Sequence, residues 1–120
     1  MKLKSTAAFN RTLAELLDAY PLAEKCVSDH LDNLPAIYGR GDRCPGYGAD
    51  LEVRKMRIPV APYRFSSRSG LRLLVLVLRE QEILVPLAIY KKGQFKKETD
   101  AVAWIKGKLR ELLQELHTGR

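Results

Sequence analysis

The N-terminal third of the chain carries hydrophobic residues at the spacing of amphipathic helices. From about Thr6 to Ala19 they recur every three or four positions, and Pro21 follows. Because every third or fourth side chain shares one face of a helix, this spacing predicts a helix over residues 6–19. The same spacing continues over residues 22–34. Pro35 predicts the end of this second helix, since proline lacks the N–H that continues the hydrogen-bond ladder.

The next stretch has no hydrophobic periodicity. Residues 39–48 contain four of the eight glycines, together with Pro45. Glycine and proline at this density are typical of turns and irregular segments. We therefore expect residues 39–48 to form a loop without secondary structure of its own.

Three strands are predicted in the middle of the chain. In the first, residues 51–60, alternation places Lys55 and Arg57 on one face and Arg54, Met56 and Ile58 on the other. The second strand, residues 71–79, is almost wholly apolar, which indicates a central strand that is covered on both faces. A short acidic turn leads to the third, residues 83–91, and predicts an antiparallel hairpin. Pro86 within this last strand predicts a bulge or an edge position.

A final amphipathic segment begins with a capping signal at Thr99 and Asp100 and runs to about Leu116. Its hydrophobic stripe requires a sheet or a partner to cover it. The chain of 120 residues is short enough to be one domain, residues 1–120. The expected fold class is α+β, with two N-terminal helices, an antiparallel sheet of three to four strands and a C-terminal helix.

The charge of the chain is concentrated in the predicted sheet. Residues 54–97 contain 11 Lys or Arg residues and only 2 Glu residues, whereas the net charge of the whole chain is +7. The excess of positive charge therefore lies entirely in this segment, and the rest of the chain is slightly acidic. A positive surface carried on strands is typical of a nucleic-acid contact.

Several functional classes receive no support from the sequence. Cys26 and Cys44 are too few for a disulfide scaffold or a four-cysteine zinc site, and they favour a reducing compartment. His30 and His117 have no partner at metal-ligand spacing, and no glycine-rich phosphate loop is present. No secretory leader or membrane span is recognisable. We therefore expect a cytoplasmic protein that uses no metal or cofactor and has no membrane partner.

If the protein is an enzyme, Lys and Arg residues must perform its chemistry. RNA can be cleaved by its own 2′-hydroxyl when the negative charge that develops on the phosphorus is neutralised and the 5′-oxygen is protonated. Guanidinium and ammonium groups held on a rigid sheet suit this task. The alternative from the same residues is a basic face that binds anions or an acidic partner without catalysis. Lys55, Arg57, Arg72 and Lys92 are the candidates, because the predicted hairpin brings their strand positions together.

Three sequence features in this order resemble the RelE/HigB-type toxins of bacterial toxin–antitoxin modules. They are the strand Arg54-Lys55-Met56-Arg57-Ile58, the segment Ser69-Gly70-Leu71-Arg72 that opens an apolar strand, and Leu87-Ala88-Ile89-Tyr90-Lys91-Lys92-Gly93 after an acidic turn. The likeness covers residues 51–94 and, more loosely, the helices before them. It implies a RelE-like fold, an mRNA endonuclease that acts in the ribosomal A site, and a cognate antitoxin that covers the toxin. The implied partners are thus the antitoxin, the ribosome and mRNA.

The resemblance assigns roles to the four candidates. Lys55 and Arg57 match the two basic residues of the family's first active-site strand, and Arg72 matches the arginine that contacts the scissile phosphate. Lys92 matches the basic residue after the last strand, where an arginine proposed to protonate the leaving oxygen often stands. The chain departs from the family pattern in two respects. Arg57 is too basic to act as a general base, so deprotonation of the 2′-hydroxyl would fall to Lys55 or to a group that the sequence does not identify. No tyrosine follows Lys92 within residues 94–99.

Five further residues are predicted to contact RNA or the ribosome. Arg64 and Arg68 lie in a basic link, expected to be flexible, beside the predicted site. Tyr90 replaces the missing tyrosine as a residue on which a base could stack. The remaining two are charged residues of the predicted strands, Arg54 and Lys91.

Two other functions are compatible with the same residues. The ParE-like branch of this scaffold inhibits DNA gyrase and cleaves no RNA, and a weaker basic face would favour it. A non-catalytic RNA-binding or regulatory domain would keep salt-dependent affinity for nucleic acid but would have no activity for Lys55→Ala or Arg72→Ala to remove.

Overall fold

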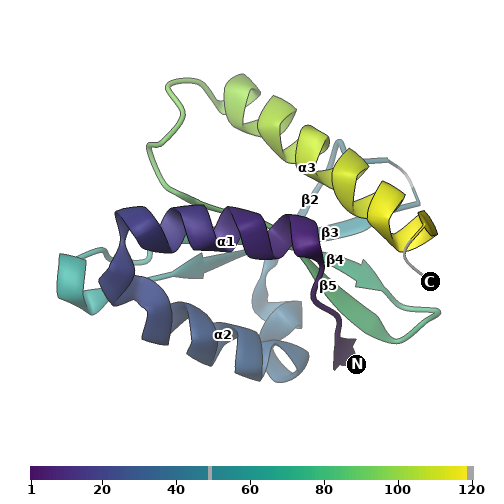
Figure 1. The fold of residues 1–120 in the computed structure, drawn as a ribbon, viewed down its shortest axis with the longest axis horizontal. Helices are drawn as coiled ribbons and strands as arrows, with labels where there is room; N and C mark the ends of the chain where they lie inside the picture. The colour runs from purple at the N-terminus through teal and green to yellow at the C-terminus, as the bar shows by residue number, and fades with distance from the viewer. Residues whose placement is uncertain (49, 119–120) are drawn as a thin grey trace.

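The computed structural model describes residues 1–48 and 50–118 and confirms the α+β class. Within these residues the sheet has five strands in the order β1-β5-β4-β3-β2. Helices α1 and α2 lie on one face of the sheet, and α3 covers the other (Figure 1). The predicted order of two helices, a sheet and a C-terminal helix is therefore observed.

The N-terminal region forms a short strand and two helices. Strand β1 (Lys2–Leu3) precedes α1 (Ala7–Ala19), whose first turn is capped by Thr6, because its Oγ1 accepts a hydrogen bond from the Phe9 N–H at 3.2 Å. A single 3₁₀ turn, η1 (Pro21–Ala23), leads into α2 (Glu24–Ile37). The first predicted helix is confirmed almost to the residue.

The prediction that Pro35 ends the second helix is wrong. Helix α2 continues to Ile37, and the Tyr38 N–H still donates to the Leu34 carbonyl. Proline lacks the N–H that would donate to the carbonyl four residues earlier, and its ring crowds that carbonyl. Because Pro35 stands in the last turn, the helix loses one bond near its end and is not interrupted in its middle.

The segment predicted to be a loop without secondary structure contains two elements. A 3₁₀ turn, η2 (Tyr38–Arg40), is followed by strand β2 (Asp42–Cys44), which pairs antiparallel with β3 (Glu52–Ile58). Three residues are too few for a strand pattern to be visible in sequence. The open edge of β3 supplies the hydrogen-bonding partners that make β2 a strand.

The central hairpin agrees with the sequence prediction. Strand β4 (Leu71–Leu78) pairs antiparallel with β3 on one side and with β5 (Ile83–Lys91) on the other. Leu74 pairs with Ala88 while Val75 pairs with Pro86, so the extra residue Leu87 forms the bulge that Pro86 predicted. The predicted strand number and the wholly antiparallel pairing are wrong, because β1 adds a fifth strand that runs parallel to β5.

Strand β4 is buried on both faces, as predicted. On one face it packs against α1 and α2 through residues such as Phe9, Leu16 and Leu34. On the other face it packs against α3 (Glu98–Thr118) through Ile105, Leu109 and Leu112. The chain itself thus covers both faces of β4.

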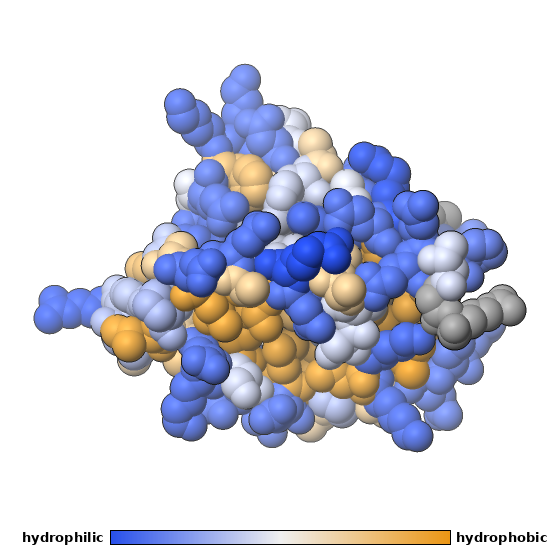
Figure 2. All heavy atoms as spheres, in the orientation of Figure 1, coloured by the Kyte–Doolittle hydropathy of each residue, from blue (hydrophilic) through white to orange (hydrophobic). Residues whose placement is uncertain are grey.

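The two ends of the chain meet through one carboxylate. Glu115 near the end of α3 accepts hydrogen bonds from the backbone N–H groups of Ala7 and Ala8, at 2.7 and 3.1 Å. This contact satisfies two donors at the start of α1 and holds α3 across the fold. Hydrophilic residues cover most of the face seen in Figure 2, and hydrophobic residues show between α1 and α2. Among the described residues, no helix is long and apolar enough to cross a membrane.

Candidate functional site

Two arginines and a tyrosine form a row across the sheet. Arg57 of β3 lies opposite Arg72 of β4, which in turn lies opposite Tyr90 of β5. Lys55 precedes Arg57 by two residues and therefore shares its face. The intervening residue Met56 packs with α1 and α2, so this row and Lys55 lie on the face that α3 covers.

Beside this row lies a pocket of about 250 Å³, here called the basic pocket. It brings together three of the four predicted catalytic residues, Lys55, Arg72 and Lys92. The other lining residues come from β5, the turn after it and the start of α3: Tyr90, Gly93, Phe95, Lys96, Lys97, Glu98 and Ala101. Five cationic side chains and one carboxylate thus line a single hollow.

Lys92 is held in this pocket by a turn that follows β5. The Gln94 N–H donates to the Lys91 carbonyl at 2.9 Å, and Gly93 adopts a positive φ of 89°, which glycine accepts without strain. The Lys92 N–H donates to the Gly70 carbonyl at 3.0 Å. The backbone of Lys92 is therefore hydrogen-bonded to Gly70, the residue before β4, and β4 carries Arg72.

Arg72 is the one charged residue within the apolar strand β4, and only 5% of it is exposed. Its guanidinium group donates to the carbonyl oxygens of Ser67 at 2.9 Å, Arg68 at 2.8 Å and Leu71 at 3.3 Å. Burial lowers the pKa of Arg72, and the positive charge of Arg57 lowers it further. The side chain is pre-positioned, but part of its hydrogen-bonding capacity serves the link before β4.

Arg57, the fourth predicted catalytic residue, lies outside the basic pocket. Its side chain is 54% exposed, and Nη2 lies 3.7 Å from Oδ2 of Asp42. It lines a neighbouring pocket of about 290 Å³ together with Lys55, Asp42, Arg40 and His30. Lys55 lines both pockets, so Arg57 stands beside the basic pocket and not within it.

Tyr90 is close to the predicted site but is covered. Its ring packs edge-on against Phe95 and Trp104, at centroid distances of 5.6 and 6.0 Å, and only 6% of the residue is exposed. Burial raises the pKa of its phenol. A base could stack on Tyr90 only after these neighbours moved. Trp104 takes part in the same packing, since its ring also lies 5.3 Å from that of Phe95.

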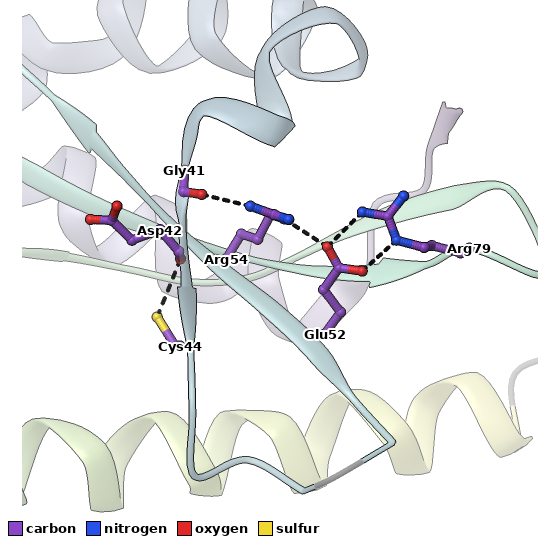
Figure 3. A network of polar contacts seen from close by, with 6 residues as sticks. All are labelled: Gly41, Asp42, Cys44, Glu52, Arg54 and Arg79. Atoms are coloured by element: carbon purple, nitrogen blue, oxygen red, sulfur yellow. Dashed lines mark hydrogen bonds and ion pairs between the residues drawn. The ribbon is translucent and has the colours of Figure 1, made fainter.

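Arg54 lies on the opposite face of the sheet, where it belongs to a partly buried ionic network (Figure 3). Its Nε donates to Glu52 at 2.7 Å and its Nη1 to the Gly41 carbonyl at 2.8 Å. Arg79 donates to the same carboxylate through Nε at 2.6 Å and Nη2 at 2.9 Å. The hydrogen bond from Arg79, followed by that from Arg54, lowers the pKa of Glu52 to about 2 against the effect of burial. The structure thus gives Arg54 a stabilising partner away from the basic pocket.

The remaining predicted RNA contacts lie around the link between β3 and β4. Lys91 also points away from the pocket, with Nζ 4.4 Å from the centre of the Phe65 ring. Arg64 and Arg68 are exposed. The link that carries them is ordered by the Val60–Phe65 bridge and by a turn in which the Ser66 N–H donates to Ser69 Oγ at 3.0 Å. The link therefore has a defined backbone conformation, and its flexibility stays a prediction.

The sequence interpretation missed Glu98 and gave Lys96 and Lys97 only a general role as solvated or phosphate-positioning charges. All three line the basic pocket. The signal in the sequence was their place between a strand-ending glycine, Gly93, and the start of the last helix. Their position in the sequence predicts a loop, but it does not predict that the loop turns toward Lys55 and Arg72.

The described residues offer no candidate metal site. Among the residues that the structure describes, no three His, Cys, Asp or Glu side chains are grouped so that they could hold a metal ion. His30 instead places Nδ1 3.1 Å from the Cys26 carbonyl within its own helix.

Comparisons with models of known protein families and with curated proteins found no match to this chain.

Proposed function

We propose that this protein is the toxin of a type II toxin–antitoxin module and cleaves mRNA on the translating ribosome without a metal ion. The observation that supports this proposal is the meeting of Lys55, Arg72 and Lys92 in the basic pocket. These residues come from two strands and the turn after a third, and each was assigned a role by the resemblance to RelE/HigB-type toxins. The ribosome and the antitoxin follow from that resemblance, and a cytoplasmic location is expected from the two cysteines.

The chemistry of the pocket suits a phosphate whose negative charge increases during reaction. When the 2′-hydroxyl attacks the adjacent phosphorus, charge builds up on the non-bridging oxygens. Fixed cations stabilise that charge without having to reorganise. Arg72 is held rigidly for this purpose by the carbonyl groups of Ser67 and Arg68. Lys92 is placed by its backbone bond to Gly70 and supplies an ammonium group that can protonate the leaving 5′-oxygen.

One observation favours a second candidate, an RNA-binding domain without catalysis. Arg72 already donates three hydrogen bonds to backbone carbonyls, so a structural role accounts for its burial. In that case the pocket would bind the phosphate backbone through its lysines, and affinity would fall steeply as salt increases.

Controlled expression in a bacterial host separates these candidates. Growth and the 5′ ends of cellular mRNA are followed for the wild type, for a Lys55→Ala, Lys92→Ala variant and for a Lys25→Ala, Lys106→Ala control. The control removes the same charge from exposed positions on α2 and α3. The proposed toxin arrests growth and produces new ends within translated codons, in the wild type and the control only. Unimpaired growth without new ends would favour the binding domain, and arrest without new ends would favour the gyrase inhibitor.

A further inference from the structure

The proposed reaction needs a group that removes the proton of the 2′-hydroxyl, and the basic pocket contains one side chain suited to this. Lysine and arginine are protonated at neutral pH and cannot accept a proton. Tyr90 is also protonated, because burial raises the pKa of its phenol further. The other lining side chains, apart from Glu98, carry no titratable group. Glu98 is thus the single carboxylate on the wall of the pocket.

Glu98 lines two adjoining pockets, the basic pocket and a second pocket formed with β2. It is the first residue of α3, and it lines the basic pocket together with Lys55, Arg72 and Lys92. It also lines an adjoining pocket of about 220 Å³ formed with β2. Lys55 and Tyr90 are shared by the two pockets as well, so Glu98 stands at their junction, whereas Lys92 belongs to the basic pocket alone.

The Glu98 carboxylate forms no ion pair with the described residues. Within the described part of the chain, no Lys or Arg nitrogen lies within 4.0 Å of it, although five cationic side chains line the same pocket. Burial raises the pKa values of Tyr90, Cys44 and Tyr47, and the negative charge of Glu98 adds to the increase in each case.

We propose that Glu98 is the general base of the RNA cleavage reaction, an inference that rests on the proposed function. Glu98 takes the proton from the 2′-hydroxyl as the 2′-oxygen forms a bond to the phosphorus. The bond between the phosphorus and the 5′-oxygen breaks, and the 5′-oxygen takes a proton from the Lys92 ammonium group. One product ends in a 2′,3′-cyclic phosphate and the other in a 5′-hydroxyl.

A pair of matched variants tests this assignment. Glu98→Gln removes the base, while Asp100→Asn removes the same charge from the same first turn of α3 at an exposed residue outside the pocket. Single-turnover cleavage of mRNA on programmed ribosomes is measured over a range of pH. Binding is measured separately with an RNA in which the attacking hydroxyl is 2′-O-methylated. The control shows whether any loss comes from the end of the helix and not from the pocket.

We expect Glu98→Gln to slow cleavage by roughly 100-fold or more, which is the usual range for a lost general base. Its binding of the methylated RNA should be as tight as that of the wild type or tighter, and the fall in rate toward acid pH should disappear. Asp100→Asn should behave as the wild type. If the wild type cleaves and Glu98→Gln cleaves at the same rate with the same pH profile, the assignment of Glu98 is overturned alone. If the wild type does not cleave, the proposed function is overturned with it.

Discussion

Arg57 and Arg72 face each other across the β3–β4 pair, as directly opposed residues of antiparallel strands. The positive charge of Arg57 is one reason why the pKa of Arg72 is lowered, after burial. Like charges in this arrangement repel and cost stability.

Removing one member of this pair should stabilise the protein when no anion is bound. We expect Arg57→Gln to raise the free energy of unfolding by about 0.5 kcal/mol at low salt, and the gain should shrink as salt screens the repulsion. The exposed ion pair of Arg57 with Asp42 offsets little of this. Urea denaturation at two salt concentrations measures the effect, with Arg11→Gln on the exposed side of α1 as the control. A loss of stability in Arg57→Gln would contradict the expected repulsion.

The structural part of the Arg72 role can be separated from its charge. Arg72→Lys keeps the positive charge but cannot reproduce the hydrogen bonds to the carbonyls of both Ser67 and Arg68. We expect a loss of about 1–3 kcal/mol of unfolding free energy, because hydrogen bonds from a charged donor to partly buried carbonyls are lost. Hydrogen exchange should also become faster in residues 64–70. Unchanged exchange in this segment would show that the link holds its conformation without Arg72.

The Glu52 network predicts a loss of stability in acid. The pKa of Glu52 is about 2 in the folded protein, compared with its ordinary value of 4.5. The carboxylate therefore contributes stability that is fully present above pH 4.5 and is lost as the pH falls toward 2. Relative to the wild type, Glu52→Gln should unfold at a lower temperature at neutral pH, and the difference should vanish near pH 2. Glu80→Gln, at an exposed position in the β4–β5 turn, should show no such pH dependence.

Gly70 is required by close packing where β4 begins. A Cβ atom at this position would collide with the carbonyl oxygen of Ile58 and would lie 2.8 Å from that of Ser66. We expect Gly70→Ala to cost about 1–3 kcal/mol, as overpacking usually does, and to displace the Arg72 strand. Gly39→Ala is the matched control, since a Cβ there meets nothing within 4 Å. Equal stabilities of the two variants would contradict the close contact at Gly70.

The main elements of the fold were predictable because their patterns are long. Helices α1 and α3 carry a helical periodicity, β3 alternates over seven residues, and β4 and β5 are apolar runs of eight and nine residues. Pro86 indicated the bulge at Leu87. Strands β1 and β2 have two and three residues, too few to show alternation. They exist because β5 and β3 offer open edges to nearby chain, which is a tertiary effect.

The site was predictable to the extent that strand alternation and hairpin register determine it. Alternation placed Lys55 and Arg57 together, and the hairpin brought Lys92 close to Arg72. The same alternation separated Arg54 from them, but its pairing with Glu52 and Arg79 depends on the register of β3 with β4. Glu98 could not be foreseen, since its place depends on the Gly93 turn and on how α3 packs against the sheet.

The most direct test of the central claim is cleavage of ribosome-bound mRNA by the purified protein, with the new ends identified chemically. The basic pocket predicts cleavage that persists after free divalent ions are exchanged for polyamines to keep the ribosomes intact. It also predicts a 2′,3′-cyclic phosphate at the new 3′ end, no cleavage where the attacking nucleotide is 2′-deoxy, and loss of cleavage in Lys55→Ala, Lys92→Ala. Cleavage of the 2′-deoxy substrate, or cleavage that the double variant retains, would contradict the account.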